Sequence, residues 1–459
     1  MSAVSAQLYH LGISTDPDKV VIGKDGWLFL GDSYAKSITR KRGYLPEEAQ
    51  AAERTLSNSA TTWNNWFRAR GIKEYLILIG PDKDSIYSDK VPKWALHSNP
   101  TLMDELMGKL DKRFFIYPTE KLSEARHKFN LPIYYTTDTH WNLLGGTVAF
   151  DAFKDVFAAR HPEIIFPKSI EGNNIDASER TGGDLANFLR IRNSLRDTEL
   201  QFKNHVYPTL SVEHFDFASG QKIYSGSNPD VAILTTPTIV SSKHALNDSR
   251  VLWLRDSFGS ALAPMMTMTF RETLQLHHNR ANPALLNDIV KKFKPDYVFV
   301  THVERDVLSS FLTSFPELES SHSKEGFIAS ETGFSSALHH LVATADGDTN
   351  EINGIDPFIV FRLPKAVAAR DISGIAFDLI CQGAENDIPI QMYWRNDKTT
   401  FMESKSIRFQ ASTGTNLLPL MVNLPWMSTD TVTEVRLDLD DPTRCKAVAF
   451  NDVALGSIH

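Results

Sequence analysis

Apolar and polar residues alternate in two different rhythms along this chain of 459 residues. In the first part, apolar positions recur every three or four residues, and Leu56, Ala60, Trp63 and Phe67 mark one face of a helix that Gly71 ends. Short runs that are apolar throughout lie between such helices, as in EYLILIG at residues 74–80. Such a run is typical of a strand buried on both faces of a parallel sheet.

The same alternation continues toward residue 303. It predicts helices at 147–160, 260–270 and 283–293, and strands at 251–255, 272–278 and 296–303. Repeated strand–helix alternation with apolar strands indicates a parallel sheet flanked by helices, which is an α/β fold.

The rhythm changes near residue 310, where a stretch rich in Ser and acidic residues suits a linker. Beyond it, apolar and polar residues alternate with a period of two, as in IPIQMYWRN at 388–396 and VTEVRLDLDD at 432–441. At least six such segments predict an antiparallel β-sandwich. We therefore predict an α/β domain over residues 1–315 and a sandwich over 325–459. Residues 160–245 are mixed in character and are expected to form an insertion with long loops.

Charge and hydropathy narrow the function classes. The chain has 48 basic and 56 acidic residues, which argues against non-specific binding to nucleic acid or to an anionic membrane. No apolar run approaches the roughly 20 residues of a membrane span. The first residues lack a basic segment followed by an apolar one, so no signal peptide is predicted. The chain is expected to be cytoplasmic, or to be a segment of a longer exported or membrane-bound protein.

Two cysteines, Cys381 and Cys445, are the only ones in the sequence. Their spacing matches no zinc site. They could pair with each other, but two buried free thiols are the favoured expectation, because free Cys is among the most buried residue types.

The segment YYTTDTHWNLLGG at residues 134–146 carries the first candidate chemistry. In an extended segment, Asp138 and His140 project to the same face, so both can reach one cleft. A carboxylate bonded to one imidazole nitrogen leaves the other nitrogen to accept a proton from a hydroxyl. A packed histidine or a metal-ligand pair remains an alternative, but no spacing in the sequence completes a metal set, although His277, His278 and His302 follow strands.

A candidate nucleophile lies in VLWLRDSFG, where Ser257 follows an apolar strand and opens a helix. Active sites of α/β folds lie at this end of the strands, and the start of a helix can hold a developing oxyanion. The alternative is that Asp256 or Ser257 simply caps the helix.

Six blocks occur in one order along the chain: GKDGWLFL, PDKDSIYSDKVP, TDTHWNLLGG, GGDLANFL, RDSFG and PDYVFVTHVERD. Over about residues 20–310 they resemble the bacterial exopolysaccharide O-acetyltransferases typified by the alginate acetylation proteins. The resemblance implies an SGNH-hydrolase-like fold with permuted topology and a catalytic triad of Asp138, His140 and Ser257. It also implies that Ser257 takes up an acetyl group and passes it to a sugar hydroxyl, with His140 acting as base and then as acid.

Other site residues are less well marked. The SGNH family adds a Gly and an Asn side chain to the oxyanion hole, but the Gly-x-Asn block is replaced here by THVERD. Arg305 or His302 is then a candidate to face the site, although Arg305 could equally form a structural ion pair. Arg280 is a further candidate. Gly183 could bring a backbone amide to the acyl group or could serve only a turn.

The C-terminal sandwich resembles the jelly-roll, carbohydrate-binding-module-like domain that follows the catalytic domain in some family members. Tyr393, Trp394 and Trp426 are candidates to stack on sugar rings, because planar aromatics cover the apolar faces of pyranoses. Their alternative is a place in the core of the sandwich.

The sequence therefore favours an O-acetyltransferase acting on a bacterial polysaccharide, without a metal or cofactor and with an acetyl donor that is not predicted. A carbohydrate esterase would use the same triad, and a non-catalytic glycan-binding assembly protein would keep only the fold. A metal-dependent hydrolase is a third alternative. The resemblance further implies a periplasmic setting and a membrane-bound acyltransferase that supplies the acetyl group.

Overall fold

The computed structural model of the protein describes residues 2–171, 174–203, 209–231, 234–316, 318–420, 426 and 429–458. The chain divides into two compact units, Met1–Phe315 and Pro316–His459.

An eight-stranded sheet forms the centre of the first unit, with the strand order β4-β3-β12-β10-β11-β9-β7-β8. The strands are β3 (Glu74–Gly80), β4 (Phe115–Ile116), β7 (Val212–Asp216), β8 (Lys222–Gly226), β9 (Thr238–Ser242), β10 (Asn247–Arg255), β11 (Phe270–His277) and β12 (Tyr297–Val303).

Five of these strands, from β4 to β11 in the sheet order, are parallel, which confirms the predicted parallel sheet. The other three strands, β9, β7 and β8, are antiparallel additions at one edge. They come from residues 212–242, so part of the region expected to be a loop-rich insertion extends the sheet.

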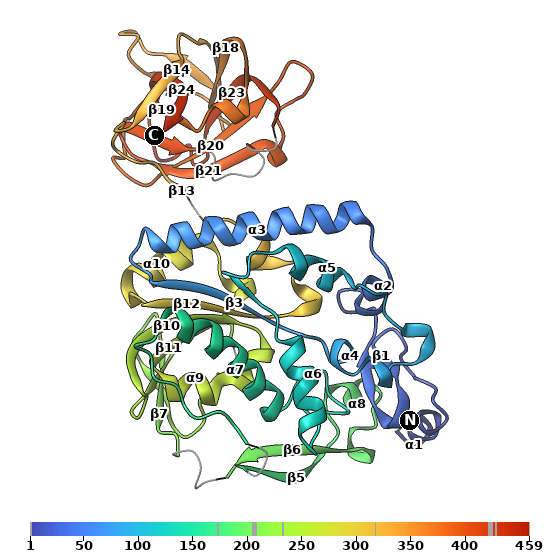
Figure 1. Ribbon diagram of the computed structural model, residues 1–459. Helices are drawn as coiled ribbons and strands as arrows, with labels where there is room; N and C mark the ends of the chain where they lie inside the picture. The colour runs from blue at the N-terminus through green and yellow to red at the C-terminus, as the bar shows by residue number, and fades with distance from the viewer. Residues whose placement is uncertain are drawn as a thin grey trace. The chain divides into compact units, whose positions relative to one another are not determined.

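Helices cover both faces of this sheet (Figure 1). The helices α3 (Pro46–Arg68), α5 (Leu102–Lys109) and α10 (Pro283–Phe293) lie on one face, and α6 (Thr119–Lys128), α7 (Leu143–Arg160) and α9 (Ala263–Thr269) lie on the other. The apolar stripe of α3 packs into one core cluster with the β-strand residues beneath it. Every residue of β3 is buried, as expected for a strand with helices on both sides.

Smaller elements frame the end of the sheet where the site lies. They are α1 (Ser2–His10), β1 (Val20–Ile22), β2 (Leu28–Leu30), α2 (Ser37–Arg42), α4 (Lys83–Ile86), β5 (Ile175–Thr181), α8 (Asp184–Phe188) and β6 (Arg196–Phe202). The strand pairs β1–β2 and β5–β6 are antiparallel.

The second unit contains two six-stranded sheets that are antiparallel apart from the pairing of β13 with β21. One sheet has the order β13-β21-β20-β23-β18-β15, and its strands are β13 (Leu318–Glu319), β15 (Ser335–His339), β18 (Phe358–Ala368), β20 (Ile388–Arg395), β21 (Ser406–Ala411) and β23 (Thr431–Leu439). The other has the order β16-β17-β24-β19-β22, with β14 also paired to β24. Its strands are β14 (Phe327–Glu331), β16 (Leu341–Ala343), β17 (Asn350–Ile352), β19 (Gly374–Cys381), β22 (Gly414–Pro419) and β24 (Ala447–Ile458). Both sheets contribute to one hydrophobic core, which confirms the predicted sandwich.

Cys381 and Cys445 form a disulfide, so the expectation of two free thiols was wrong. Cys381 ends β19, and Cys445 lies just before β24, the strand that pairs with β19. The pairing of the strands brings the two residues together although they are 64 positions apart in the sequence.

Of the helices in the described part of the chain, none combines the length and the apolar character that crossing a membrane requires.

Candidate active site

Ser257 lies at the carboxyl edge of the parallel strands. β10 ends at Arg255, and Ser257 begins the 3-10 helix η6 (Ser257–Leu262) after one intervening residue. The flanking strands β11 and β12 run in the same direction as β10 and end at the same edge. This is the edge at which α/β sheets place their ligands.

The side chains of Asp138, His140 and Ser257 form a hydrogen-bonded row. Nδ1 of His140 lies 2.7 Å from Oδ1 of Asp138, and Nε2 of His140 lies 2.8 Å from Oγ of Ser257. When Nδ1 donates its proton to the carboxylate, Nε2 has a lone pair directed at the serine hydroxyl. The row therefore has the connectivity that a serine nucleophile needs.

Asp138 is held in its ionised form. Burial would raise the pKa of its carboxyl, but hydrogen bonds from the His140 ring and from the backbone N–H groups of Asp184 and His140 keep that pKa below its usual range. Nη2 of Arg180 lies 3.9 Å from Oδ2 of the same carboxylate. An ionised Asp138 can stabilise the imidazolium that forms when His140 takes up a proton.

Two further carboxylates hold the loop that carries Asp138. Asp197, in β6, accepts hydrogen bonds from the N–H and hydroxyl of Thr136, at 3.2 and 2.9 Å, and from those of Thr137, at 2.7 and 2.6 Å. Asp184, at the start of α8, accepts from the N–H and hydroxyl of Thr139 at 2.8 and 2.5 Å. Both acids belong to the region expected to be an insertion, which is thus part of the frame of the site.

Asp256 fixes the turn that presents Ser257. Its Oδ1 accepts the N–H of Phe258 at 2.9 Å, and its Oδ2 accepts the N–H of Val303 at 2.7 Å. The first bond caps η6, and the second ties the turn to the end of β12. Of the two residues considered as helix caps, Asp256 and Ser257, it is therefore Asp256 that caps the helix. The Ser257 hydroxyl instead lies at hydrogen-bonding distance from His140.

Among the residues that the structure describes, two groups of three His, Asp or Glu side chains have ligand atoms within 4.8 Å of one another. One of them, Asp138, His140 and Asp184, is part of the hydrogen-bonded set described above. The other, Asp256, His278 and His302, lies behind the Ser257 turn, and its two imidazole rings are stacked with centroids 4.0 Å apart and planes 21° apart. A nitrogen lone pair lies in the plane of its ring, so nearly parallel stacked rings cannot both direct a lone pair at one ion. The geometry of this second group fits packing and hydrogen bonding.

A groove of about 380 Å³ opens beside Ser257. Its lining consists of Tyr135, Asp138, His140, Trp141, Asn142, Leu143, Arg180, Glu199, Leu200, Ser257, Ser260 and Ala261. On its polar wall, Nη1 of Arg180 lies 3.1 Å from Oε2 of Glu199, and the guanidinium lies 4.4 Å from the centroid of the Tyr135 ring. Leu143, Leu200 and Ala261 supply apolar surface. A few polar groups on a partly apolar wall are typical of a small-molecule site.

Gly183 has a different role from the one expected. Its N–H donates to Oγ1 of Thr137 at 2.9 Å and is therefore not available to an oxyanion, so that expectation is corrected. A Cβ at this position would lie 2.3 Å from Cβ of Asp138. The absence of a side chain allows the chain to pass directly against the carboxylate.

Arg305 forms the structural ion pair that was the alternative for it. Its Nη1 lies 2.5 Å from Oδ1 of Asp82, and the guanidinium lies 5.6 Å from the centroid of the Phe258 ring. Arg280 is exposed at the end of η7 (His278–Arg280), after β11, and does not belong to the described lining of the groove. Its role in substrate binding stays a prediction.

The aromatic candidates of the second unit lie mainly in its core. Trp394 and Trp426 are fully buried, with ring centroids 5.2 Å apart. Their indole N–H groups donate to Thr429 and to the backbone oxygens of Ala369 and Ile372. Neither ring can stack on a sugar at the surface, so this expectation is corrected. The side chain of Tyr393 is also largely covered, and its hydroxyl donates to Oε1 of Glu403 at 2.6 Å.

Sequence reasoning missed several residues of the site. Arg180 and Glu199 form an ion pair across the antiparallel strands β5 and β6, and no pattern in the sequence marks them. Asp184 lies inside the GGDLANFL block, so that block contained a signal for it. Asp197 carries no local signal, because its partners are 60 and 61 positions away.

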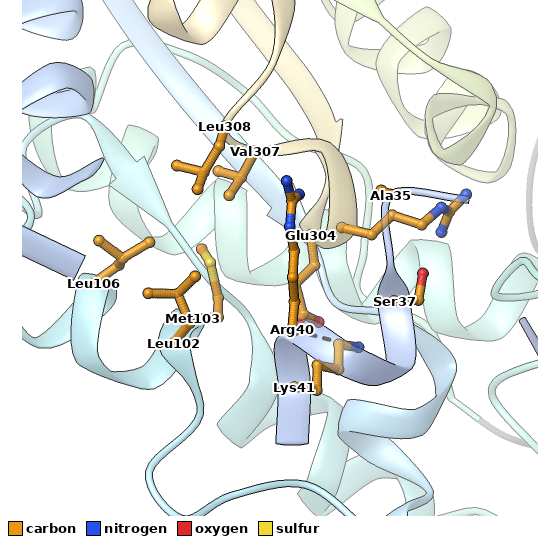
Figure 2. A pocket seen from close by; sticks show the side chains of 11 residues that line it. Ala35, Ser37, Arg40, Lys41, Leu102, Met103, Leu106, Glu304, Val307 and Leu308 are labelled. Atoms are coloured by element: carbon orange, nitrogen blue, oxygen red, sulfur yellow. Dashed lines mark ion pairs between the residues drawn. The ribbon is translucent and has the colours of Figure 1, made fainter. Parts of the chain in front are cut away.

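A smaller cavity, of about 40 Å³, lies beside a network of buried ion pairs. Figure 2 shows the apolar side chains of Leu102, Met103 and Leu106 on one side of it and an ion pair between Lys41 and Glu304. Nζ of Lys41 lies 3.4 Å from that carboxylate and also contacts Asp82 and Asp84, at 3.2 and 2.8 Å. These ion pairs join α2, α4 and the end of β12, and we assign the network a structural role.

Residues 20–232 match the family described as "SGNH hydrolase-like domain, acetyltransferase AlgX". The matched residues include Asp138 and His140 and end before Ser257. Comparison of the sequence with curated proteins gives no match.

Several solved structures are similar to this chain. PatB1 of Bacillus cereus is 16% identical, with 63% of this chain and 97% of that chain covered and a TM-score of 0.45. The O-acetyltransferase domain of Pseudomonas putida AlgJ is also 16% identical, with 65% and 94% covered and a TM-score of 0.39. Pseudomonas aeruginosa AlgX is 11% identical, with 94% of each chain covered and a TM-score of 0.39. Over residues 20–232, somewhat less than half of its length, this chain is thus similar to the SGNH hydrolase-like acetyltransferase domains of the AlgX family.

Proposed function

We propose that the protein is an O-acetyltransferase that moves an acetyl group through an acyl-enzyme at Ser257 onto hydroxyls of a bacterial polysaccharide. One observation carries the proposal. The Asp138–His140 distance of 2.7 Å and the His140–Ser257 distance of 2.8 Å connect a carboxylate, an imidazole and a hydroxyl in a row beside an open groove.

In the first half-reaction, Oγ of Ser257 attacks the carbonyl carbon of the acetyl donor while its proton passes to Nε2 of His140. Asp138 stabilises the resulting imidazolium through Nδ1. The oxyanion develops near the N–H of Ser257 at the start of η6, where the helix end favours negative charge. His140 then gives its proton to the leaving group, and Ser257 carries the acetyl ester.

In the second half-reaction, a sugar hydroxyl replaces the leaving group. His140 takes the proton of that hydroxyl as its oxygen attacks the acetyl ester, and then returns a proton to Ser257. Arg180, Glu199 and Tyr135 offer hydrogen-bonding groups on the wall of the groove, where they can orient the acceptor.

Water is the competing acceptor, and it defines the nearest alternative, a carbohydrate esterase. Ser257 is exposed at the floor of the groove, so water has access to the acyl-enzyme. Slow hydrolysis of an activated acetyl ester is therefore expected even when no sugar is present.

The second unit is proposed as a glycan-binding module, but at a place other than the buried tryptophans. A cleft of about 410 Å³ includes the half-buried Phe334 and the exposed polar residues Asn451 and Asp452. An aromatic ring beside amide and carboxylate groups suits a pyranose.

The setting of the reaction is part of the proposal. The disulfide between Cys381 and Cys445 favours an oxidising compartment outside the cytoplasm, such as the periplasm. A membrane-bound acyltransferase that supplies the acetyl group is the proposed partner.

The test uses the purified full chain with p-nitrophenyl acetate, in the presence and absence of acceptor oligosaccharides. The Ser257→Ala variant is expected to lower kcat at least about 10³-fold, whereas Ser88→Ala, at an exposed serine, leaves it unchanged. Acetylated oligosaccharide, identified by mass spectrometry, supports transfer. Acetate release without any acetylated sugar would favour the esterase, and full activity of Ser257→Ala would refute the mechanism.

A further inference from the structure

Lys83 lies beneath the loop that carries Asp138 and His140. It is the first residue of α4, three positions after β3 ends, and only 3% of its surface is exposed. Its Nζ donates hydrogen bonds to three backbone carbonyl oxygens of one short segment, those of Tyr135 at 3.0 Å, Thr136 at 3.1 Å and Asp138 at 2.7 Å.

The number of these bonds matches the chemistry of the side chain. A lysine ammonium has three N–H donors, and three carbonyl oxygens receive them here. Burial of an ammonium costs free energy unless its N–H groups form hydrogen bonds. All three N–H groups of Lys83 have an acceptor here, and each of these bonds holds one carbonyl oxygen of the loop in place. The rings of Trp27 and Phe29, from the GKDGWLFL block, lie 5.6 and 5.4 Å from the same Nζ.

The loop is thus held from two sides by groups of opposite charge. Asp197 and Asp184 bind its N–H and hydroxyl groups, whereas Lys83 binds its carbonyl oxygens. The N–H of Leu28 adds one more bond, to the oxygen of Thr136 at 2.9 Å. With both kinds of backbone group fixed, the backbone that carries the Asp138 side chain has little freedom to move.

We infer that Lys83 is a positioning residue, which holds the Asp138–His140 loop so that the imidazole reaches Ser257 at hydrogen-bonding distance. The inference rests on the proposed function, since it assigns Lys83 a part in the same reaction. Lys83 does not line the groove within the described residues, so it acts through the loop and not on the substrate.

If Lys83 holds the loop, kcat should depend on the protonation of its amine. Burial lowers the pKa of Lys83 to about 8. The negative charges of the carboxylates that face the amine act in the opposite direction and raise this pKa; they belong to Asp197, Asp138, Asp184 and Asp84. Above this pKa the amine keeps only two N–H groups for three carbonyl oxygens, so the loop loosens and kcat should fall.

The stability of the protein should respond to pH in the opposite direction. The unfolded-state pKa of a lysine is about 10.4, so between about pH 8 and pH 10 the folded state binds fewer protons at this site than the unfolded state. The contribution of Lys83 to the free energy of unfolding therefore rises with pH across this window. A loss of rate above pH 8 at an undiminished melting temperature would point to the loop and not to unfolding.

The experiment compares wild type, Lys83→Met, Lys83→Arg and the control Lys93→Met, which changes an exposed lysine. Turnover of p-nitrophenyl acetate, with the Ser257→Ala rate subtracted, gives kcat and KM between pH 6.5 and about 10. Amide hydrogen exchange of residues 133–142 reports the order of the loop independently of activity.

We expect Lys83→Met to lower kcat about 100-fold with little change in KM, and to speed exchange in residues 133–142 but not in β10 or β12. Lys83→Arg, which keeps a charge that does not titrate, should retain more activity than Lys83→Met and lose the decline above pH 8. Lys93→Met should match wild type.

A rate for folded Lys83→Met within threefold of wild type, or unchanged exchange in residues 133–142, would overturn the inference. If Lys83→Met does not fold, a wild-type kcat that stays flat from pH 7 to about 10 would overturn it equally. Failure of the proposed function gives a different result, because Ser257→Ala would then keep the wild-type rate. The amide hydrogen exchange of residues 133–142, compared between Lys83→Met and wild type, would still decide whether Lys83 orders the loop.

Discussion

At the scale of single residues, the site depends on side chains that are held by backbone contacts. Asp138 and His140 lie in a loop and are not part of a strand, and the N–H of His140 donates to Oδ1 of Asp138 at 3.2 Å, in addition to the bond from its ring. Gly183 passes so close to the carboxylate that it limits the positions the carboxylate can adopt.

Gly183→Ala tests this close approach. The φ of Gly183 is −83°, which any residue can adopt, so the substitution acts only through its Cβ, at 2.3 Å from Cβ of Asp138. We expect kcat for p-nitrophenyl acetate to fall about 100-fold and the free energy of unfolding to fall by about 1–3 kcal/mol.

Gly108→Ala is the matched control, because a Cβ there would meet nothing within 4 Å. It lies inside α5 and should stabilise the protein by about 0.5–1 kcal/mol without changing kcat. If both variants behave alike, the contact with Asp138 has no role in positioning.

The structure brings together Asp138, His140 and Ser257, the three residues proposed from the sequence, but part of the reasoning behind the first two was wrong. The spacing of two was expected to place both side chains on one face of an extended segment, whereas the described backbone has only an isolated bridge between Tyr134 and Trp141 there. The side chains meet because Asp184, Asp197 and Lys83 bind the loop. Such contacts join residues 45 to 61 positions apart and leave no local pattern to recognise.

At the scale of secondary-structure elements, the parallel strands bring separate parts of the chain to one edge. β10 delivers Ser257, and β12 delivers the N–H of Val303, which Asp256 accepts at 2.7 Å. The apolar strands and the helices between them were predictable because their hydrophobic period is strong. The antiparallel strands β7, β8 and β9 were not, because β8 is exposed throughout and the region has no regular pattern.

Asp256→Asn tests the link between these elements. The amide can keep the bond to Phe258, but its NH₂ group would then face the N–H of Val303, which would lose its acceptor. The change should cost about 1–3 kcal/mol in the free energy of unfolding, measured by urea denaturation, and should lower kcat. A variant as stable and as active as wild type would show that Asp256 does not hold the Ser257 turn.

At the scale of the whole molecule, the two units have different folds. Met1–Phe315 carries the candidate triad on a mixed sheet, whereas Pro316–His459 is a sandwich closed by one disulfide. The boundary near residue 310 is visible in the sequence as a change in hydrophobic period. The disulfide was not predictable from a separation of 64 positions, and the burial of Trp394 and Trp426 depends on how the two sheets pack.

Replacing both cysteines by serine should destabilise the second unit alone. A loop closed across 64 positions corresponds to about 4 kcal/mol in the chain-entropy account, and measured effects are commonly about 2–4 kcal/mol. In differential scanning calorimetry, we expect one transition to move to lower temperature while the kcat for p-nitrophenyl acetate stays at the wild-type value. A loss of kcat below that transition would contradict the assignment of the reaction to the first unit alone.

Direct detection of acetyl on Ser257 tests the central claim of an acyl-enzyme. The full chain is mixed with p-nitrophenyl acetate, quenched in acid within the first turnovers and digested, and the peptide that contains Ser257 is examined by mass spectrometry. We expect one acetyl group on Ser257 in the wild type, little on that residue in His140→Ala, and loss of the label when an acceptor oligosaccharide is added before the quench. Turnover with Ser257 unmodified at every time point would contradict the mechanism.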